Sequence, residues 1–140
     1  MESLADQLIR HEGLELHLYK CSGKPPKITI GVGRNVQDNG ITEDEARFML
    51  KTDIDRSRKE LETFYWWEDL DEVRKDCLIN MVFNLGFPTF KKFKGLISDL
   101  EDKNYKMASL NMLDSRWAKQ VKNRSKELAE QMRTGERQHG

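Results

Sequence analysis

The sequence predicts a single α+β domain that is mainly helical, with a small antiparallel sheet near its N-terminus. Two short apolar stretches with strand-like alternation flank a turn rich in Gly and Pro between residues 16 and 33. From residue 42 onward, apolar side chains recur at helical spacing almost to the end of the chain. A chain of 140 residues is also long enough to bury a substantial core within one domain.

Composition excludes several classes of protein. Charged residues make up 34% of the chain and no apolar run is long enough to span a bilayer, so we expect no stable membrane insertion. No basic stretch leads into an apolar one at the N-terminus, so we expect no signal peptide. Two cysteines, Cys21 and Cys77, are too few for a disulfide scaffold, and their spacing predicts no metal site. Cys77 lies in an apolar run and should be buried, whereas His139 should lie in a frayed tail.

The charges are unevenly distributed although the net charge is zero. Residues 1–88 hold 12 Lys or Arg against 17 Asp or Glu, whereas residues 89–140 hold 12 against 7. The basic part could attract an anionic polymer. Because no zinc spacing, basic zipper or aromatic RNA-stacking motif accompanies it, we expect no nucleic-acid partner.

The first predicted helix covers residues 3–11. Ser3 with Asp6 resembles a capping box, and Gly13 is a good helix terminator. Glu12 therefore lies at the C-terminal, negative end of the helix dipole, which disfavours the charged form of a carboxyl group. On local sequence alone, a glutamate beside a capping glycine is most simply an ordinary solvated side chain.

A β-hairpin should follow, with strands over residues 16–19 and 27–33 and a turn over residues 22–26. Two glycines beside a threonine would give the second strand a face on which a ligand can approach the backbone closely. Residues 35–40 should form a loop or a third short strand. The alternation places Ile28, Ile30 and Val32 on one face of the second strand, and Thr29, Gly31 and Gly33 on the other.

Helices are predicted for most of the remaining chain. Thr42 and Glu45 form a capping box at the start of a long helix over residues 42–62, whose highly charged face suits a bridge between two lobes. Residues 77–83 are apolar on nearly all sides and should form the centre of a helical lobe. The residues expected to begin or end these helices are Asp69 or Asp71, Gly86, Asn104 and Asn123.

Three motifs near the N-terminus resemble the catalytic segment of the phage-type lysozymes, the glycoside hydrolase family 24 muramidases that include the T-even phage enzyme. The family pattern is a Glu-Gly at the end of the first helix, an Asp or Cys after a Tyr-containing strand, and a Thr-Ile-Gly-x-Gly strand. Here these positions hold Glu12, Cys21 and Thr29. Later matches follow in the family's order, at residues 40–46, 78–86, 115–117, 123–124 and 133–135.

The resemblance implies a lysozyme-like, two-lobed domain with a cleft between the lobes. Its N-terminal lobe would cover about residues 13–41, and an interlobe helix would cover about residues 42–62. The helical C-terminal lobe would comprise residues 63–140 together with helix 3–11.

The resemblance also implies roles for the site residues. Glu12 would be the general acid, which a glycosidase needs in order to protonate the leaving oxygen. Cys21 would be its partner group, but a free thiol with a pKa of about 8.5 is only a few per cent ionised at neutral pH. Whether Cys21 acts as base, nucleophile or stabilising anion is therefore open. The hydroxyl of Thr29 would face the cleft and orient the attacking water.

Further residues are assigned supporting roles by the same resemblance. Arg124 corresponds to the family's arginine that pairs with the catalytic glutamate, and Asn80 would lie beside it under the cleft. Gly31 and Gly33 would lie on the substrate side of the hairpin. Two departures are the shortened segment 33–40 and an arginine after Gly33, where the family usually has histidine.

The function implied is that of an endolysin, a bacteriophage muramidase acting as a monomer on peptidoglycan without metal or organic cofactor. It would hydrolyse the β-1,4 bond between N-acetylmuramic acid and N-acetylglucosamine, degrade the cell wall and cause cytolysis, which is an antimicrobial, bacteriolytic activity. It would stay in the host cytoplasm until a separate protein permeabilises the membrane. Two alternatives remain: a non-catalytic peptidoglycan-binding module, for example of a phage tail, and a lytic transglycosylase.

Overall fold

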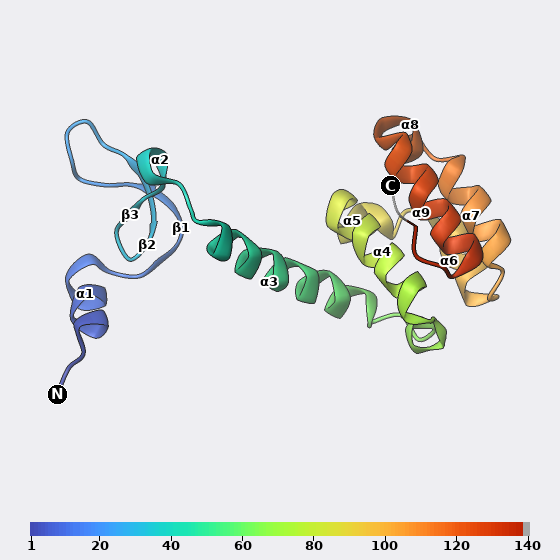
Figure 1. Cartoon of the computed structure of the whole chain (residues 1–140), viewed down its shortest axis with the longest axis horizontal. Coiled ribbons are helices and arrows are strands. Elements are labelled where there is room, and N and C mark those ends of the chain that lie inside the picture. The colour runs from blue at the N-terminus through green and yellow to red at the C-terminus, as the bar shows by residue number, and fades with distance from the viewer. Residues whose placement is uncertain (139–140) are drawn as a thin grey trace. The chain divides into compact units, whose positions relative to one another are not determined.

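A computed structural model describes residues 1–138 of the chain, and His139 lies outside this range. The chain divides into two compact units, Met1–Met49 and Leu50–Gly140. The first unit holds a small sheet, and the regular structure of the second is helical (Figure 1). The predicted mainly helical α+β fold class is confirmed. The assignment of helix 3–11 to the helical lobe stays a prediction.

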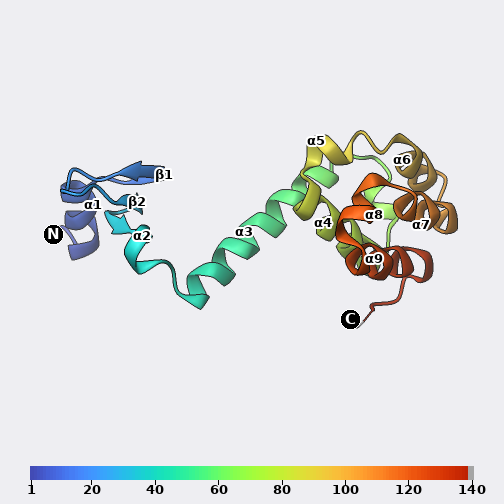
Figure 2. The same ribbon diagram turned by 90° about the horizontal axis from the view of Figure 1, so that it is seen from above.

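The first unit contains a three-stranded antiparallel sheet with the strand order β1-β2-β3. A short helix, α2, occupies part of the segment for which the sequence predicts a loop or a third strand. Figure 2 shows the sheet from a second direction. The elements of this unit before the long helix are α1 (Leu4–Glu12), β1 (Glu15–Lys20), β2 (Ile28–Gly31), β3 (Arg34–Asn35) and α2 (Val36–Asn39).

Both predicted boundary signals of helix α1 are confirmed. The Ser3 side chain accepts a hydrogen bond from the backbone N–H of Asp6 at 3.0 Å. Gly13 has φ +82° and its N–H donates to the carbonyl of Ile9 at 2.7 Å, which ends the helix. The helix therefore includes Glu12 as its last residue, one position beyond the predicted end.

The β-hairpin ends earlier than the sequence predicts. Tyr19 of β1 lies opposite Thr29 of β2, and the register shifts once between Glu15 and Tyr19. Strand β2 stops at Gly31, so its predicted extension to Gly33 is wrong. Gly31, the last residue of β2, has φ +73° and Gly33 has φ +65°, and positive φ values such as these end the extended conformation of the strand. Gly33 consequently does not share the strand face of Thr29.

The long helix α3 (Glu43–Leu61) begins with the predicted capping box. The N–H of Thr42 donates to Glu45 Oε1 at 2.8 Å, and the N–H of Glu45 donates to Thr42 Oγ1 at 3.1 Å. Arg34 of β3 adds an ion pair, with Nη1 2.5 Å from Glu45 Oε1. The start of α3 is thus tied to the sheet of the first unit.

This ion pair predicts a pH dependence of stability. The Arg34 guanidinium and the Thr42 amide lower the pKa of Glu45 to about 2 in the folded chain. Because an unfolded glutamate titrates near 4.5, the stabilisation is complete above that pH and is lost as the pH falls toward 2. The difference in free energy of unfolding between wild type and Glu45→Gln, measured in urea, should narrow over this range. A constant difference would contradict the assignment.

The second unit consists of a helical bundle. Among residues 1–138, none of the helices combines the length and the apolar character needed to cross a membrane. After α3, its elements are η1 (Trp67–Asp69), α4 (Glu72–Leu85), α5 (Phe87–Phe90), α6 (Lys94–Glu101), α7 (Tyr105–Leu113), α8 (Arg116–Val121) and α9 (Asn123–Thr134).

Helix α4 supplies much of the core of this unit, as the sequence predicts, but it is not buried on all sides. Phe83 is 46% exposed and Asn80 is also exposed, so the expectation of all-round burial is wrong. Apolar composition alone does not reveal which face neighbouring helices leave uncovered. The buried members of the run are Cys77, Leu78, Ile79, Met81 and Val82.

Three of the predicted helix boundaries in this unit are confirmed and one is wrong. Gly86 ends α4, and its N–H donates to the carbonyl of Val82. Asp71 caps α4 and Asn104 caps α7, each through a side-chain oxygen that accepts a backbone N–H. Asn123 is instead the first residue of α9, preceded by Lys122 with φ +36°. An additional helix, α8, with Ser115 as its N-cap, lies between α7 and α9.

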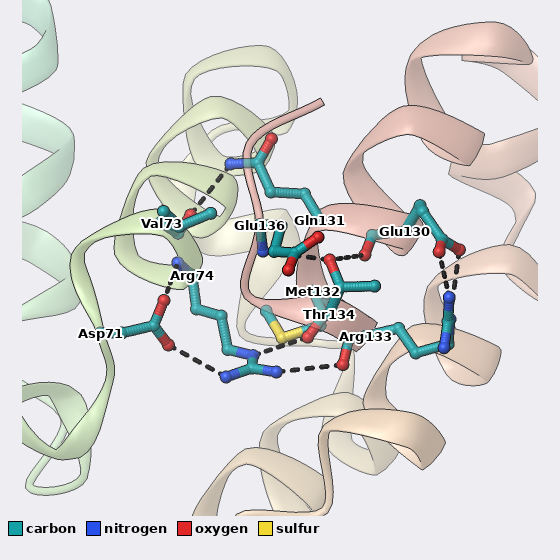
Figure 3. Close-up of polar contacts among 9 residues, drawn as sticks. All are labelled: Asp71, Val73, Arg74, Glu130, Gln131, Met132, Arg133, Thr134 and Glu136. Carbon is teal, nitrogen blue, oxygen red and sulfur yellow. Dashed lines mark hydrogen bonds and ion pairs between the residues drawn. The ribbon is translucent and has the colours of Figure 1, made fainter. Parts of the chain in front are cut away.

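Arg74 connects the start of α4 with the end of α9 (Figure 3). Its Nε donates to the carbonyl of Met132 at 2.6 Å, and its Nη2 donates to that of Arg133 at 3.0 Å. The guanidinium also pairs with Asp71 at 3.1 Å and lies 4.0 Å from the ring centroid of Tyr105. Arg74 therefore satisfies carbonyls that the end of α9 leaves without a helical partner.

Candidate active site

Glu12 lies beside a concave surface of the first unit. It is the last residue of α1, and its exposed side chain lines a pocket of about 440 Å³. The lining of this pocket is largely apolar, and among residues 1–138 Glu12 is its one charged residue. The other lining residues are Ala5, Leu8, Ile9, Val32 and Gly33.

Gly33 packs directly against the Glu12 carboxyl group. A Cβ atom at residue 33 would lie 2.9 Å from Glu12 Oε2, closer than such contacts occur, and 3.3 Å from Cδ, which is a tight contact. A Cβ at Gly31, by contrast, would have no neighbour within 4 Å. The absence of a Cβ atom at Gly33 therefore leaves the space that the Glu12 carboxyl group occupies.

Cys21 is the first residue after β1, at the start of the hairpin turn, and lies opposite Lys27 at the end of this turn. Its backbone N–H donates to the carbonyl of Lys27 at 2.9 Å, and its Sγ accepts from the N–H of Lys27 at 3.3 Å. The Lys27 amide, followed by the amide of Gly23, lowers the pKa of the Cys21 thiol. Backbone donors around the sulfur thus favour the thiolate form.

Thr29 is held by the same residue. Its hydroxyl donates to the carbonyl of Lys27 at 2.8 Å, and the residue is only 2% exposed. The structure therefore brings Cys21 and Thr29 together at Lys27. The Thr29 hydroxyl also hydrogen-bonds to the Cys21 sulfur, which is a smaller cause of the lowered pKa of that thiol. Its predicted role in orienting water stays a prediction.

Asn80 and Arg124 meet in the second unit. The guanidinium of Arg124 donates to Asn80 Oδ1 through Nε at 3.0 Å and Nη2 at 2.7 Å. Asn80 thus has the partner that an amide in an apolar run requires. Both residues line a pocket of about 410 Å³ with the apolar side chains of Ile79 and Phe83. Glu12 belongs to the other unit, so the pairing of Arg124 with Glu12 stays a prediction.

Sequence reasoning missed the main chain of Lys27 and the contribution of Gly23. No residue pattern could have identified them, because every residue except proline carries the same amide and carbonyl. The adjacent Pro25-Pro26 pair marks the turn but not its contacts. Among residues 1–138, no group of three or more His, Cys, Asp or Glu side chains is arranged to hold a metal ion.

The two cysteines should differ strongly in reactivity. Cys77 is 0% exposed, its Sγ donates to the carbonyl of Leu128 at 3.2 Å, and burial raises the pKa of its thiol. We expect iodoacetamide to modify Cys21 in the native protein and Cys77 about 10³-fold more slowly, since Cys77 reacts only when the core opens. Peptide mapping by mass spectrometry measures both rates, and both should become similar in denaturant. Equal rates in the native protein would contradict the burial of Cys77.

Comparison with known proteins identifies the family. The Phage lysozyme family pattern matches residues 9–136, most of the chain. The chain belongs to the phage lysozyme family. The chain is 27% identical over 165 residues to Probable T4-type lysozyme 1 of Dictyostelium discoideum. It is 28% identical over 167 residues to Probable T4-type lysozyme 2 of the same organism. Each match covers 96% of both chains.

A phage protein is also similar to this phage lysozyme family member. The Pre-baseplate central spike protein Gp5 of Enterobacteria phage T4 is 25% identical over 160 residues, which cover 95% of this chain and 28% of Gp5. The family resemblance stated from the sequence motifs is therefore confirmed. Family membership supports a lysozyme-like function that acts on peptidoglycan, in the general class of glycosidases.

Proposed function

We propose that this phage lysozyme family member is a monomeric endolysin, a muramidase that hydrolyses the β-1,4 bond between N-acetylmuramic acid and N-acetylglucosamine. The observation that carries the proposal is the arrangement within the first unit. Glu12 lines a pocket at the end of α1, and the hairpin that follows α1 holds a thiol and a hydroxyl at one backbone position. A glycosidase needs an acid and a second polar group that handles water or stabilises charge.

In the proposed mechanism, Glu12 donates its proton to the glycosidic oxygen as the bond from this oxygen to the sugar carbon breaks. The oxygen of a water molecule forms the new bond to that carbon. One proton of this water passes to the Cys21 thiolate, and Thr29 accepts a hydrogen bond from the same water. The products are two sugar hydroxyl groups, a Glu12 carboxylate and a neutral Cys21 thiol, so atoms and charge balance.

Digestion of purified peptidoglycan tests this function. We expect release of reducing ends, measured by a colorimetric assay, and fragments whose masses contain one added water per cleavage. Anhydro-sugar products would show a lytic transglycosylase instead, and binding without release would show a non-catalytic module. Expression inside bacteria tests the endolysin role: lysis should require a separate membrane-permeabilising protein. Lysis that is independent of that protein would contradict this role.

The contact between Gly33 and Glu12 predicts that Gly33 and Gly31 differ in their importance for hydrolysis. Gly33→Ala and Gly31→Ala both place a side chain at positive φ, which costs about 1–2 kcal/mol. Only Gly33→Ala also displaces the Glu12 carboxyl group, so we expect its hydrolysis rate to fall by a further factor of about 10–100. The rates of reducing-end release of the two variants and of wild type measure this difference. They are compared at a temperature at which thermal unfolding shows all three proteins to be folded. Equal rates for both variants would contradict a role of Gly33 in positioning Glu12.

A further inference from the structure

The backbone N–H and carbonyl groups of Lys27 hydrogen-bond to two candidate site residues, Cys21 and Thr29. The Lys27 N–H donates to Cys21 Sγ at 3.3 Å. The Lys27 carbonyl accepts from the N–H of Cys21 at 2.9 Å and from the hydroxyl of Thr29 at 2.8 Å. Lys27 therefore makes three hydrogen bonds to Cys21 and Thr29, and two of them involve the thiol and the hydroxyl of these side chains.

We propose that the main chain of Lys27 is a positioning element: its N–H, 3.3 Å from Cys21 Sγ, orients the sulfur so that it can take the proton of the attacking water. This inference rests on the proposed function, in which Cys21 is the base, and deepens it by naming the backbone group that positions the Cys21 sulfur. The Thr29 hydroxyl lies beside both partners: it donates to the Lys27 carbonyl at 2.8 Å and also hydrogen-bonds to the Cys21 sulfur, and its lone pairs can accept from a water.

The chemistry of the three bonds supports this division of roles. A hydrogen bond from an amide is stronger to a thiolate than to a neutral thiol, so the Lys27 N–H favours the charged form. A water between Thr29 and Cys21 can donate one proton to each acceptor and keep a lone pair for the sugar carbon. When the new bond to carbon forms, the proton directed at sulfur moves to Sγ and the Lys27 N–H remains bonded to it.

Charged side chains near the turn do not explain the stabilised thiolate. Lys27 Nζ forms an ion pair with Asp38 of α2 at 3.3 Å. The lowered pKa of Cys21 has backbone amides as its largest causes, and no charged side chain is among its causes. The charged side chains of β1, the turn, β2, β3 and α2 are Glu15, Lys20, Lys24, Lys27, Arg34 and Asp38, and β1 also carries the titratable His17.

Two substitutions of Lys27 separate its amide from its side chain. Lys27→Ala removes the ammonium group but keeps the N–H, whereas Lys27→Pro removes both. The readout is the pH dependence of Cys21 alkylation by iodoacetamide, followed by peptide mapping. We expect Lys27→Ala to keep the midpoint of wild type and Lys27→Pro to raise it by about one to two pH units. Equal midpoints for Lys27→Pro and Lys27→Ala would overturn the proposal.

A second measurement uses the wild-type chain and does not depend on the folding of Lys27→Pro. In ¹H–¹⁵N NMR spectra, the Lys27 amide resonance should shift with pH at the midpoint of Cys21 alkylation, and Cys21→Ala should abolish this transition. A Lys27 resonance without that inflection would overturn the proposal.

The two proposals can fail separately. A wild-type protein that titrates as expected but releases no sugar ends would refute the proposed function and leave the amide–thiolate contact standing. A wild-type protein that hydrolyses peptidoglycan without the Lys27 inflection would refute only the role of Lys27.

Discussion

Glu12→Gln should lower the rate of peptidoglycan hydrolysis by about 10²–10⁴-fold, the usual contribution of a general acid. Glutamine has nearly the same shape and volume, so the pocket at the end of α1 should keep its form. Its amide cannot supply the proton that the leaving oxygen needs. We therefore expect kcat to fall while KM changes little, because binding of the glycan does not depend on that proton.

A control in the same unit distinguishes loss of the acid from a general effect of removing charge. Glu15→Gln changes an exposed glutamate in β1 and should retain the activity of wild type. Thermal unfolding followed by circular dichroism should give the same midpoint for both variants. If Glu12→Gln clears cell walls as fast as Glu15→Gln, Glu12 is not the acid.

Leu78→Ala should lower the free energy of unfolding of the second unit by about 2–5 kcal/mol. Leu78 is 0% exposed at the centre of α4, and its neighbours in the same helix, Cys77 and Met81, are equally buried. Truncation removes the burial of several methyl groups and leaves a cavity that the surrounding helices cannot fill completely.

Leu110→Ala is the matched control because Leu110 belongs to another helix of the same unit, α7, but is 50% exposed. Leu110→Ala should lower the free energy of unfolding by less than about 1 kcal/mol. The tryptophans report this unit selectively, since Trp66, Trp67 and Trp117 all lie in it and are buried. Urea unfolding followed by tryptophan fluorescence therefore measures both variants. Equal losses would contradict the placement of Leu78 in the core.

Helix boundaries were largely predictable from the sequence. The caps at Ser3, Asp71 and Asn104 and the box of Thr42 with Glu45 are formed as predicted. Each uses a side chain and a backbone group three residues apart, so the interaction is encoded locally.

The misplaced boundary at Asn123 has a tertiary cause. Helix α8 precedes it, and Trp117 in α8 is 2% exposed with its Nε1 donating to Asn84 Oδ1 of α4 at 2.7 Å. This contact holds α8 against a helix far away in the sequence, and α9 then begins at Asn123 with Lys122 as its N-cap. Such contacts leave no capping signal that a sequence pattern could reveal.

By itself, the sequence determined the fold class, most helix ends and the order of family motifs that brings Glu12, Cys21 and Thr29 to attention. Local periodicity, caps and residue types carry this information, because they depend on groups close together along the chain. Only the tertiary structure decided that Gly33 leaves space for the Glu12 carboxyl group and that Lys27 bonds to both Cys21 and Thr29. These contacts depend on the path of the backbone, and a backbone amide or a missing Cβ acts only on the groups that this path places next to it.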